Sequence, residues 1–214
     1  MARKGIREYD AKRMLATAIS GYDGRSVIVG PREDLRSKAE ANPWLKTEKL
    51  VAKPDQLFGK RGKNNLLSLN KDLEDTAVWI DGLMGVEKTL MSGITGTLDH
   101  FLVEPFTPFT SDTVENYVAF VLGVDGDTVY LSNMGGVEVE ENWDNVKEIK
   151  LPVLVDADKS AFEATVNELY PEAHREIILT FLTELYGHFK DNGYTYLEIN
   201  PFVVSAGKVV PLDT

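Results

Sequence analysis

The middle of this 214-residue chain carries three strand-like segments in succession, with no helical pattern between them: Asn116 to Val124, Thr128 to Ser132, and Glu148 to Leu154. The dipeptide Asp125-Gly126 between the first two is a strong β-hairpin signal. Strands joined by a tight hairpin run antiparallel, whereas parallel strands need a long crossover connection. The succession therefore argues against a doubly wound parallel sheet.

Helical and strand-like patterns mix along the rest of the chain without strict alternation. The apolar spacing predicts helices over Ile6 to Ser20, Pro31 to Ala41, Leu73 to Leu83, and His174 to Lys190, the last ending at Asn192-Gly193. Strands are predicted over Arg25 to Val29, Lys49 to Pro54, Leu66 to Leu69, Tyr196 to Val204, and Lys208 to Leu212. This mixture predicts an α+β fold.

The composition excludes several classes of function. With 43% hydrophobic residues the chain can build a core, and its formal charge of −11 opposes a nucleic-acid-binding face, which must be basic. A few Lys and Arg residues can still form a local phosphate pocket. The chain has no cysteine, so it holds no disulfide, zinc thiolate site or cysteine nucleophile. Neither a secretory signal nor an apolar run of the ~20 residues that span a bilayer is visible, so a cytoplasmic protein with no membrane partner is expected.

Lys53 and the basic loop after it are the first candidates for binding an anion. Lys53 ends an apolar strand, and a lysine on a buried strand needs a negative partner, of which a triphosphate is one. The alternative is an exposed lysine at a sheet edge. The loop from Gly59 to Lys63 places Lys60 and Arg61 beside two glycines, where cations and backbone amides could converge on phosphate. It matches neither the Walker A nor the Rossmann spacing, and taken alone such a loop is more often a solvated turn.

Glu104 is a second candidate, because it is a carboxylate between apolar neighbours in the run Phe101 to Phe106. In a connection between two lobes it could accept a ribose hydroxyl or an adenine contact. Alternation along a strand gives the other interpretation, in which Glu104 lies on the outward, solvated face. The three histidines lack the serine or acid pattern of a catalytic triad.

The end of the chain predicts a two-stranded ribbon with hard oxygen ligands at one end. If Ala206-Gly207 is the centre of the hairpin, paired residue numbers sum to 413, so Asn200 faces Asp213. Directly opposed residues share a face, and Glu198 lies two residues before Asn200 on the same face. Such oxygen ligands suit Mg²⁺, which takes one or two protein ligands plus phosphate oxygens. A polar, solvated face is the alternative.

The same segments resemble the ATP-grasp half of the succinyl-CoA synthetase and ATP-citrate lyase superfamily. Most similar is the smaller, succinyl-CoA synthetase beta-like subunit of two-subunit ATP-citrate lyases. The resemblance spans nearly the whole chain in order. It rests on Glu8 to Lys12, Asn42 to Leu45, Leu50 to Leu57 with Lys60 to Lys63, Phe101 to Phe106, Gly135 to Val139 and, most specifically, Tyr194 to Pro201.

This resemblance implies an ATP-grasp fold whose two lobes clamp a nucleotide. The smaller lobe would span residues 25–103 and the second lobe residues 1–24 and 104–214, while the family's carboxy-terminal CoA-ligase domain would be absent. The family's roles carry over to matching positions: Lys53, Lys60, Arg61 and Gly62 on the phosphates, Glu104 and Glu115 on the nucleoside, Asn200 and Asp213 on Mg²⁺, and Glu198 near a phosphohistidine. Lys60 stands where the synthetases usually have glycine.

The implied reaction is ATP-driven cleavage of citrate. ATP phosphorylates a histidine, the phosphoryl group passes to citrate, coenzyme A gives citryl-CoA, and cleavage yields acetyl-CoA and oxaloacetate. The cofactors would be ATP or ADP with Mg²⁺, and CoA and citrate would bind in the complete hetero-oligomeric enzyme. A larger partner subunit would carry the phosphohistidine and the citrate-synthase-like region. The alternatives are a citryl-CoA or succinyl-CoA synthetase subunit of the beta type, and a non-catalytic nucleotide-binding or assembly module.

Overall fold

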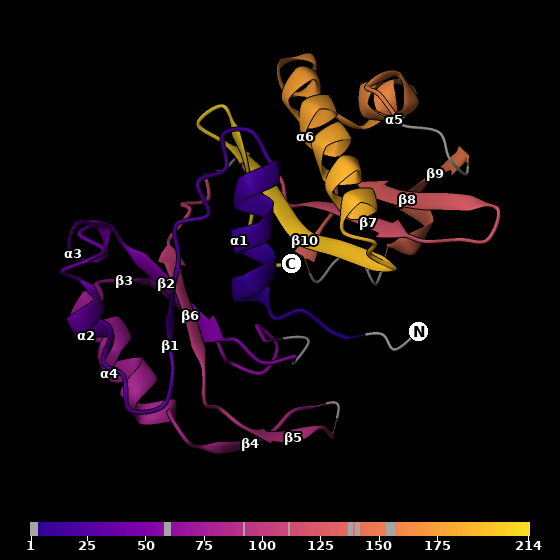
Figure 1. The fold of residues 1–214 in the computed structure, drawn as a ribbon. Helices are drawn as coiled ribbons and strands as arrows, with labels where there is room; N and C mark the ends of the chain where they lie inside the picture. The colour runs from indigo at the N-terminus through magenta and orange to yellow at the C-terminus, as the bar shows by residue number, and fades with distance from the viewer. Residues whose placement is uncertain are drawn as a thin grey trace. The chain divides into compact units, whose positions relative to one another are not determined.

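A computed structural model describes residues 4–57, 61–91, 93–110, 112–136, 139, 142–152 and 157–214 (Figure 1). The chain divides into two compact units. The first unit comprises Met1–Ala11 and Arg25–Pro108, and the second comprises Lys12–Gly24 and Phe109–Thr214. Helix α1 (Glu8–Ala18) begins in the first unit and continues in the second. No helix among the described residues is both long and apolar enough to cross a membrane.

The first unit is built on a four-stranded antiparallel sheet with the order β1-β6-β2-β3. The strands are β1 (Val27–Val29), β6 (Phe101–Pro105), β2 (Leu50–Pro54) and β3 (Ser68–Lys71). Alternate residues such as Ala52 and Val103 pack into an apolar core with α2 (Leu35–Lys38), α3 (Trp44–Thr47) and α4 (Leu73–Leu83). The opposite face of β2 and β6 is therefore left for other side chains. A separate hairpin joins β4 (Glu87–Thr89) and β5 (Thr95–Thr97).

The second unit is built on a five-stranded antiparallel sheet with the order β11-β10-β7-β8-β9. The strands are β7 (Asn116–Val121), β8 (Gly126–Ser132), β9 (Lys147–Pro152), β10 (Tyr196–Ser205) and β11 (Lys208–Pro211), and a short 3-10 helix, η2 (Trp143–Asn145), precedes β9. All of these pairings are antiparallel, and the two hairpin signals predicted this for β7–β8 and β10–β11. The β10–β11 register confirms the predicted sum of 413, because Ser205 pairs with Lys208 and Phe202 with Pro211.

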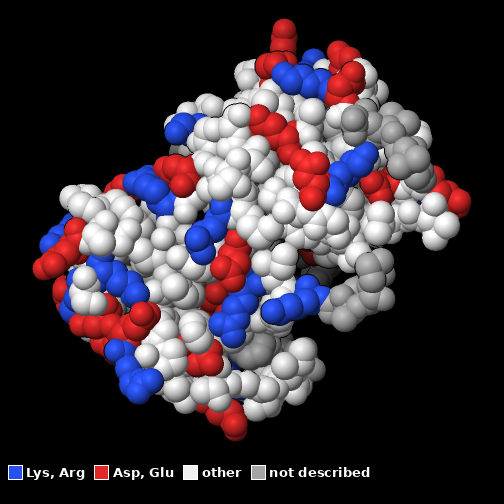
Figure 2. All heavy atoms as spheres, in the orientation of Figure 1, with Lys and Arg blue, Asp and Glu red and all other residues white. Residues whose placement is uncertain are grey.

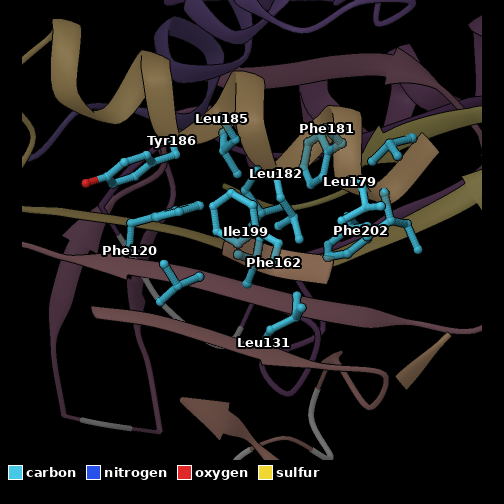
Figure 3. Packing of buried hydrophobic residues seen from close by; sticks show 14 of the residues in the cluster. Phe120, Leu131, Phe162, Leu179, Phe181, Leu182, Leu185, Tyr186, Ile199 and Phe202 are labelled. Carbon is cyan, nitrogen blue, oxygen red and sulfur yellow. The ribbon is translucent and has the colours of Figure 1, made fainter. Parts of the chain in front are cut away.

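Helices α5 (Ser160–Leu169) and α6 (Glu172–Asp191) supply the core of the second unit together with Leu15 of α1 and Ile19, which directly follows that helix. Figure 3 shows Phe181, Leu182 and Leu185 of α6 directed toward the sheet residues of this cluster. Apolar positions three and four residues apart form the stripe that made α6 recognisable. The predicted α+β class is therefore confirmed, and α6 is longer than predicted by two residues at its start and one at its end.

Several local predictions differ from the structure. The strand predicted over Leu66 to Leu69 lies two residues later, as β3, and the short helix α3 was not predicted. The helix predicted over Pro31 to Ala41 contains only the four residues of α2, because Arg32 has a φ of 68° and Asp34 is the N-cap, accepting a hydrogen bond from Arg36 N at 2.9 Å. Helix α5 was not predicted at all. Its N-cap residue, Lys159, makes no side-chain capping bond; the start signal lies one residue earlier, at Asp158, whose Oδ1 accepts from Ser160 N at 2.9 Å.

Candidate nucleotide site

Lys53 and Glu104 lie on the same face of the sheet in the first unit. Val51 pairs with Glu104 and Lys53 with Leu102, which makes Lys53 and Glu104 diagonal neighbours on adjacent strands. Lys53 Nζ lies 3.2 Å from Glu104 Oε1, and the two residues are only 4% and 8% exposed. Strand β2 lies between β6 and β3, and although β3 pairs only with Leu50 to Ala52, the Lys53 residue beside that pairing is buried. The exposed alternatives for both residues are wrong.

Glu8, the first residue of α1, bridges two cations with its two carboxylate oxygens. Oε1 lies 2.6 Å from Lys53 Nζ, and Oε2 lies 2.5 Å from Arg61 Nη2. Arg61 also donates from Nη1 to Pro54 O at 3.1 Å. Glu8 and Arg61 are 5% and 7% exposed, so these charges meet out of solvent, where ion pairs are strong and unpaired charges are costly.

Asp55 extends this cluster of buried charges. Tyr9 N donates to Asp55 Oδ1 at 3.1 Å, and Asp55 is 2% exposed. Burial raises the pKa of Asp55, and the nearby Glu8 carboxylate raises it further, although the hydrogen bond from Tyr9 works in the opposite direction. The first unit thus holds Glu8, Lys53, Asp55, Arg61 and Glu104 in one buried group.

The basic loop is only partly described. Lys60 lies outside the described residues, while Gly62 is exposed in the turn that follows Arg61. Asn65 N donates to Gly62 O at 3.1 Å, and Leu66 N donates to Arg61 O at 3.0 Å, so backbone bonds within the loop define this turn. Arg61 is buried and held by Glu8, so the solvated-turn alternative does not apply to it.

Asn200, Asp213 and Glu115 come together in the second unit around a pair of glycines. Asn200 N donates to Asp213 O at 2.9 Å, and Gly136 N donates to Asn200 Oδ1 at 2.6 Å. Gly135 N donates to Glu115 O at 2.7 Å. A Cβ on Gly136 would lie 2.2 Å from Glu115 Oε2, so the absence of a side chain lets this carboxylate approach the backbone.

The oxygens of Asn200 and Asp213 are chemically suited to Mg²⁺. An amide oxygen has two lone pairs, and Gly136 N uses one of those on Asn200 Oδ1. Within the described residues, no group of three or more His, Cys, Asp or Glu side chains is arranged to hold a metal. A metal at Asn200 and Asp213 would therefore need ligand oxygens from outside this pair, as a magnesium–nucleotide complex supplies.

Glu198 lies on β10 opposite Ala119 of β7 and is partly exposed. Tyr196 Oη donates to Glu198 Oε2 at 2.7 Å. Burial raises the pKa of Tyr196, and the bond to Glu198 adds to that effect; burial and the Glu198 charge raise the pKa of Tyr117 to about 12. The β10–β7 register shifts between Ile199 and Phe202, so the alternation that predicted a shared face for Glu198 and Asn200 is interrupted there.

Sequence reasoning assigned no role to Glu8, Gly136 or Tyr196, although all three contact predicted site residues. Glu8 contacts Lys53 and Arg61 over a sequence separation of more than forty residues, so no local spacing reveals the contact. Tyr196 and Glu198 are two residues apart on one strand, and this i, i+2 relation was the one usable signal. Gly136 lies in the Gly135 to Val139 motif, which contributed to the family resemblance but had no physical role assigned to its residues.

The charges on the visible molecular face do not form a region of one sign. Figure 2 shows Lys and Arg side chains interspersed with Asp and Glu. Since the chain carries a formal charge of −11, a phosphate group has no broad positive field to enter on that face. Binding would depend on individual cations such as Lys53 and Arg61.

Comparison with known proteins identifies the family. A family model described as the ATP-citrate synthase ATP-grasp domain matches residues 2–214. ATP-citrate synthase alpha chain protein 2 of Arabidopsis thaliana is 40% identical over 218 residues, covering 100% of this chain and 50% of the plant protein. The structure of ATP citrate lyase from Methanothrix soehngenii, in complex with citrate and coenzyme A, matches with a TM-score of 0.83 at 39% identity and covers 99% of this chain and 50% of that one.

A more distant structure shows the fold alone. Dinucleotide forming acetyl-coenzyme A synthetase 1 from Ca. Korarchaeum cryptofilum, in complex with coenzyme A and Mg-AMPPCP, matches with a TM-score of 0.63 at 17% identity over 99% of this chain. This chain spans about half the length of its plant and Methanothrix relatives. The expected ATP-grasp fold and the resemblance drawn from the motifs are confirmed, and the chain belongs to the family of ATP-citrate synthase ATP-grasp domains.

Proposed function

We propose that this chain is the nucleotide-binding part of an ATP-citrate lyase. The observation that carries the proposal is the buried group in the first unit, where Lys53 and Arg61 each meet one oxygen of the same carboxylate. Two cations held on one pair of anionic oxygens can also hold phosphate oxygens, because a phosphate presents the same kind of acceptor. The family membership supports the choice of ATP as the phosphate donor.

Lys53 and Arg61 bind and orient the phosphates in this proposal, and Glu104 and Glu115 accept hydrogen bonds from the nucleoside. Lys60 and Gly62 add donors from the loop. Phosphoryl transfer depends mainly on positioning and charge neutralisation, so fixed cations are the relevant machinery. Lys53 and Arg61 are suited to this role because both are buried and paired, which restricts their rotamers before the nucleotide binds.

Asn200 and Asp213 would hold Mg²⁺ in the second unit. Asn200 Oδ1 is oriented by the bond from Gly136 N, and the backbone bond between Asn200 and Asp213 keeps the two residues adjacent. When bound, Mg²⁺ neutralises charge on the phosphate oxygens. Because only two protein ligands are involved, the metal should bind with the nucleotide rather than before it.

Glu198 acts in this proposal beside a histidine supplied by a larger partner chain. Its carboxylate is partly exposed and is oriented by Tyr196, so it can accept a hydrogen bond from an incoming imidazole N–H. The phosphoryl group then passes from ATP to the histidine and on to citrate. The thiol of coenzyme A then displaces phosphate from the phosphorylated citrate to give citryl-CoA, which is cleaved to acetyl-CoA and oxaloacetate in the complete hetero-oligomer.

The first experiment is calorimetric titration of this chain with Mg-ADP, with the Lys53→Ala variant as the control. We expect saturable binding that requires Mg²⁺ and weakens about tenfold or more when Lys53 is removed, since a bond between charged groups contributes roughly 1.5–3 kcal/mol. No binding by the folded wild-type chain would contradict a self-contained nucleotide site. Equal affinity in both proteins would remove Lys53 from it.

The acid substrate needs the complete enzyme. With the partner chain added, we expect ATP hydrolysis that depends on citrate and coenzyme A, accompanied by a phosphohistidine on the partner. Turnover with succinate but not with citrate would point instead to a succinyl-CoA synthetase. Nucleotide binding without any histidine phosphorylation would point to a non-catalytic module.

A further inference from the structure

Glu8 is the carboxylate of the buried group that contacts both Lys53 and Arg61. Its two oxygens lie 2.6 Å and 2.5 Å from the two cationic side chains, and all three residues are at most 7% exposed. Cations withdrawn from water need an anionic partner, because an unpaired buried charge is strongly destabilising. Glu8 supplies that partner from within the chain.

The position that Glu8 occupies is the position that a phosphate would need. A carboxylate and the edge of a phosphate group both present two oxygens, and both form charge-assisted bonds with Lys and Arg. Lys53 and Arg61 cannot direct the same N–H groups at Glu8 and at a ligand simultaneously. At that position the two anions compete for the N–H groups that now point at Glu8, while other N–H groups of the two cations contact Glu104 and Pro54 O.

We propose that Glu8 is an internal counter-anion that occupies Lys53 and Arg61 until phosphate oxygens of the nucleotide replace it. This inference rests on the proposed function, since it takes the same two cations as the phosphate site. Glu8 keeps the cations paired and oriented before binding, and it lowers the apparent affinity because it must be displaced. Lys53 keeps its second carboxylate, Glu104, when Glu8 leaves.

Displacement is feasible because of where Glu8 lies in the fold. It is the first residue of α1, so its side chain can turn away by rotation about its own bonds without breaking the helix that follows. The backbone beside it stays attached through Tyr9 N, which donates to Asp55. The change is therefore confined to a side chain.

The test compares Glu8→Gln with Glu74→Gln, which removes the same charge from the same unit. Glu74 contacts Arg36 at 2.8 Å, and its side chain is 69% exposed, so it lies outside the buried group. We expect Glu8→Gln to bind Mg-ADP about tenfold more tightly than the wild type, at the lower end of typical couplings between competing interactions. Glu74→Gln should bind with wild-type affinity.

Thermal unfolding with and without inorganic pyrophosphate gives a second measurement. If Glu8 had a purely structural role, its substitution would not change how much the anion raises the Tm. Without anion, Glu8→Gln should melt below the wild type because two buried cations lose the Glu8 carboxylate that both contact. Saturating pyrophosphate should raise its Tm by more than it raises the Tm of the wild type or of Glu74→Gln. Equal anion-dependent shifts in the three proteins would overturn the counter-anion role.

A second variant covers the case in which Glu8→Gln does not fold without anion. Glu8→Asp keeps the charge but is one methylene shorter, so it cannot reach both cations equally; we expect Mg-ADP affinity between those of the wild type and Glu8→Gln. Pyrophosphate should also restore the folded state of Glu8→Gln. Failure of that rescue, together with wild-type affinity in Glu8→Asp, would overturn the inference.

The outcomes for the two proposals are separable. Wild-type binding that weakens in Lys53→Ala but does not change in Glu8→Gln would leave the proposed function standing and refute the counter-anion role. Weaker binding in Glu8→Gln would have the same meaning. If the wild-type chain did not bind Mg-ADP, but pyrophosphate raised the Tm of Glu8→Gln more than that of the wild type, the proposed nucleotide function would be refuted. The competition between Glu8 and an anion would still be supported.

Discussion

Replacing Gly136 with alanine should damage nucleotide binding far more than it damages stability. Gly136 has a φ of 66°, a left-handed conformation that costs an L-residue about 1 kcal/mol. The new Cβ would also lie 2.2 Å from Glu115 Oε2. Because that oxygen ends a flexible side chain, the carboxylate can move away, so most of the clash would be relieved by displacing Glu115.

Gly207 offers a matched control in the same unit. It lies in the β10–β11 turn with a φ of 71°, and no heavy atom lies within 4 Å of the position that an added methyl group would take. Gly207→Ala therefore introduces the same backbone strain without a clash. Both variants should lose about 1 kcal/mol of unfolding free energy, or about 2–4 °C of Tm for a chain of this size.

The two variants should separate in Mg-ADP titration. Displacing Glu115 removes a charged acceptor proposed to contact the nucleoside, so Gly136→Ala should bind about tenfold or more weakly, whereas Gly207→Ala should bind like the wild type. In a Glu115→Ala background, Gly136→Ala should cause little further loss, because its effect passes through that side chain. Wild-type affinity in Gly136→Ala, or an equal loss with and without Glu115, would refute the reasoning.

Three further predictions concern the buried acid, the metal ligand and the core. Because the folded-state pKa of Asp55 is raised, its protonated form stabilises the fold at low pH, and this contribution is lost as the pH rises through that pKa. Asp55→Asn mimics the protonated form, so it should unfold at a higher denaturant concentration than the wild type at pH 7. An equal or lower unfolding midpoint would contradict the raised pKa of Asp55. Asp213→Ala in the assembled enzyme should abolish magnesium-dependent phosphorylation of the partner's histidine, measured with labelled ATP, and a wild-type rate would remove Asp213 from the metal site. Leu182→Ala truncates a fully buried side chain and should lower the free energy of unfolding by about 2–5 kcal/mol in denaturant titration. Leu122 is 54% exposed, so Leu122→Ala should change that free energy by no more than about 0.5 kcal/mol. Similar losses in the two variants would contradict the packing in Figure 3.

Local patterns predicted two of the strand pairings of the second unit. The dipeptide Asp125-Gly126 and the turn at Ala206-Gly207 each indicated a hairpin, and both hairpins are present with the second in the predicted register. Turn chemistry acts over four residues, so a single sequence contains all the information it needs. The predicted pairing that brings Asn200 beside Asp213 followed from that register, and their backbone bond is 2.9 Å long.

Local residue patterns and the family resemblance identified Lys53, Arg61 and Glu104 as candidates, but neither indicated their partners. The pairing of β2 with β6 places Lys53 beside Glu104 across strands that are about fifty residues apart in the chain. The first turn of α1 adds Glu8 to the same group. Such contacts depend on how elements distant in sequence pack, which periodicity cannot encode.

The sequence by itself therefore determined the fold class, the family, the register of the β10–β11 hairpin and most of the residues proposed to meet a nucleotide, because each of these depends on short-range turn chemistry or on motifs read in order. Only the tertiary structure decided which charges are buried together. It replaced an isolated Lys53 with a buried group in which Glu8 holds two cations, and it placed Gly136 against Glu115 and Asn200. The physical reason is that burial and ion pairing follow from long-range packing, which fixes the local dielectric and the nearest opposite charge.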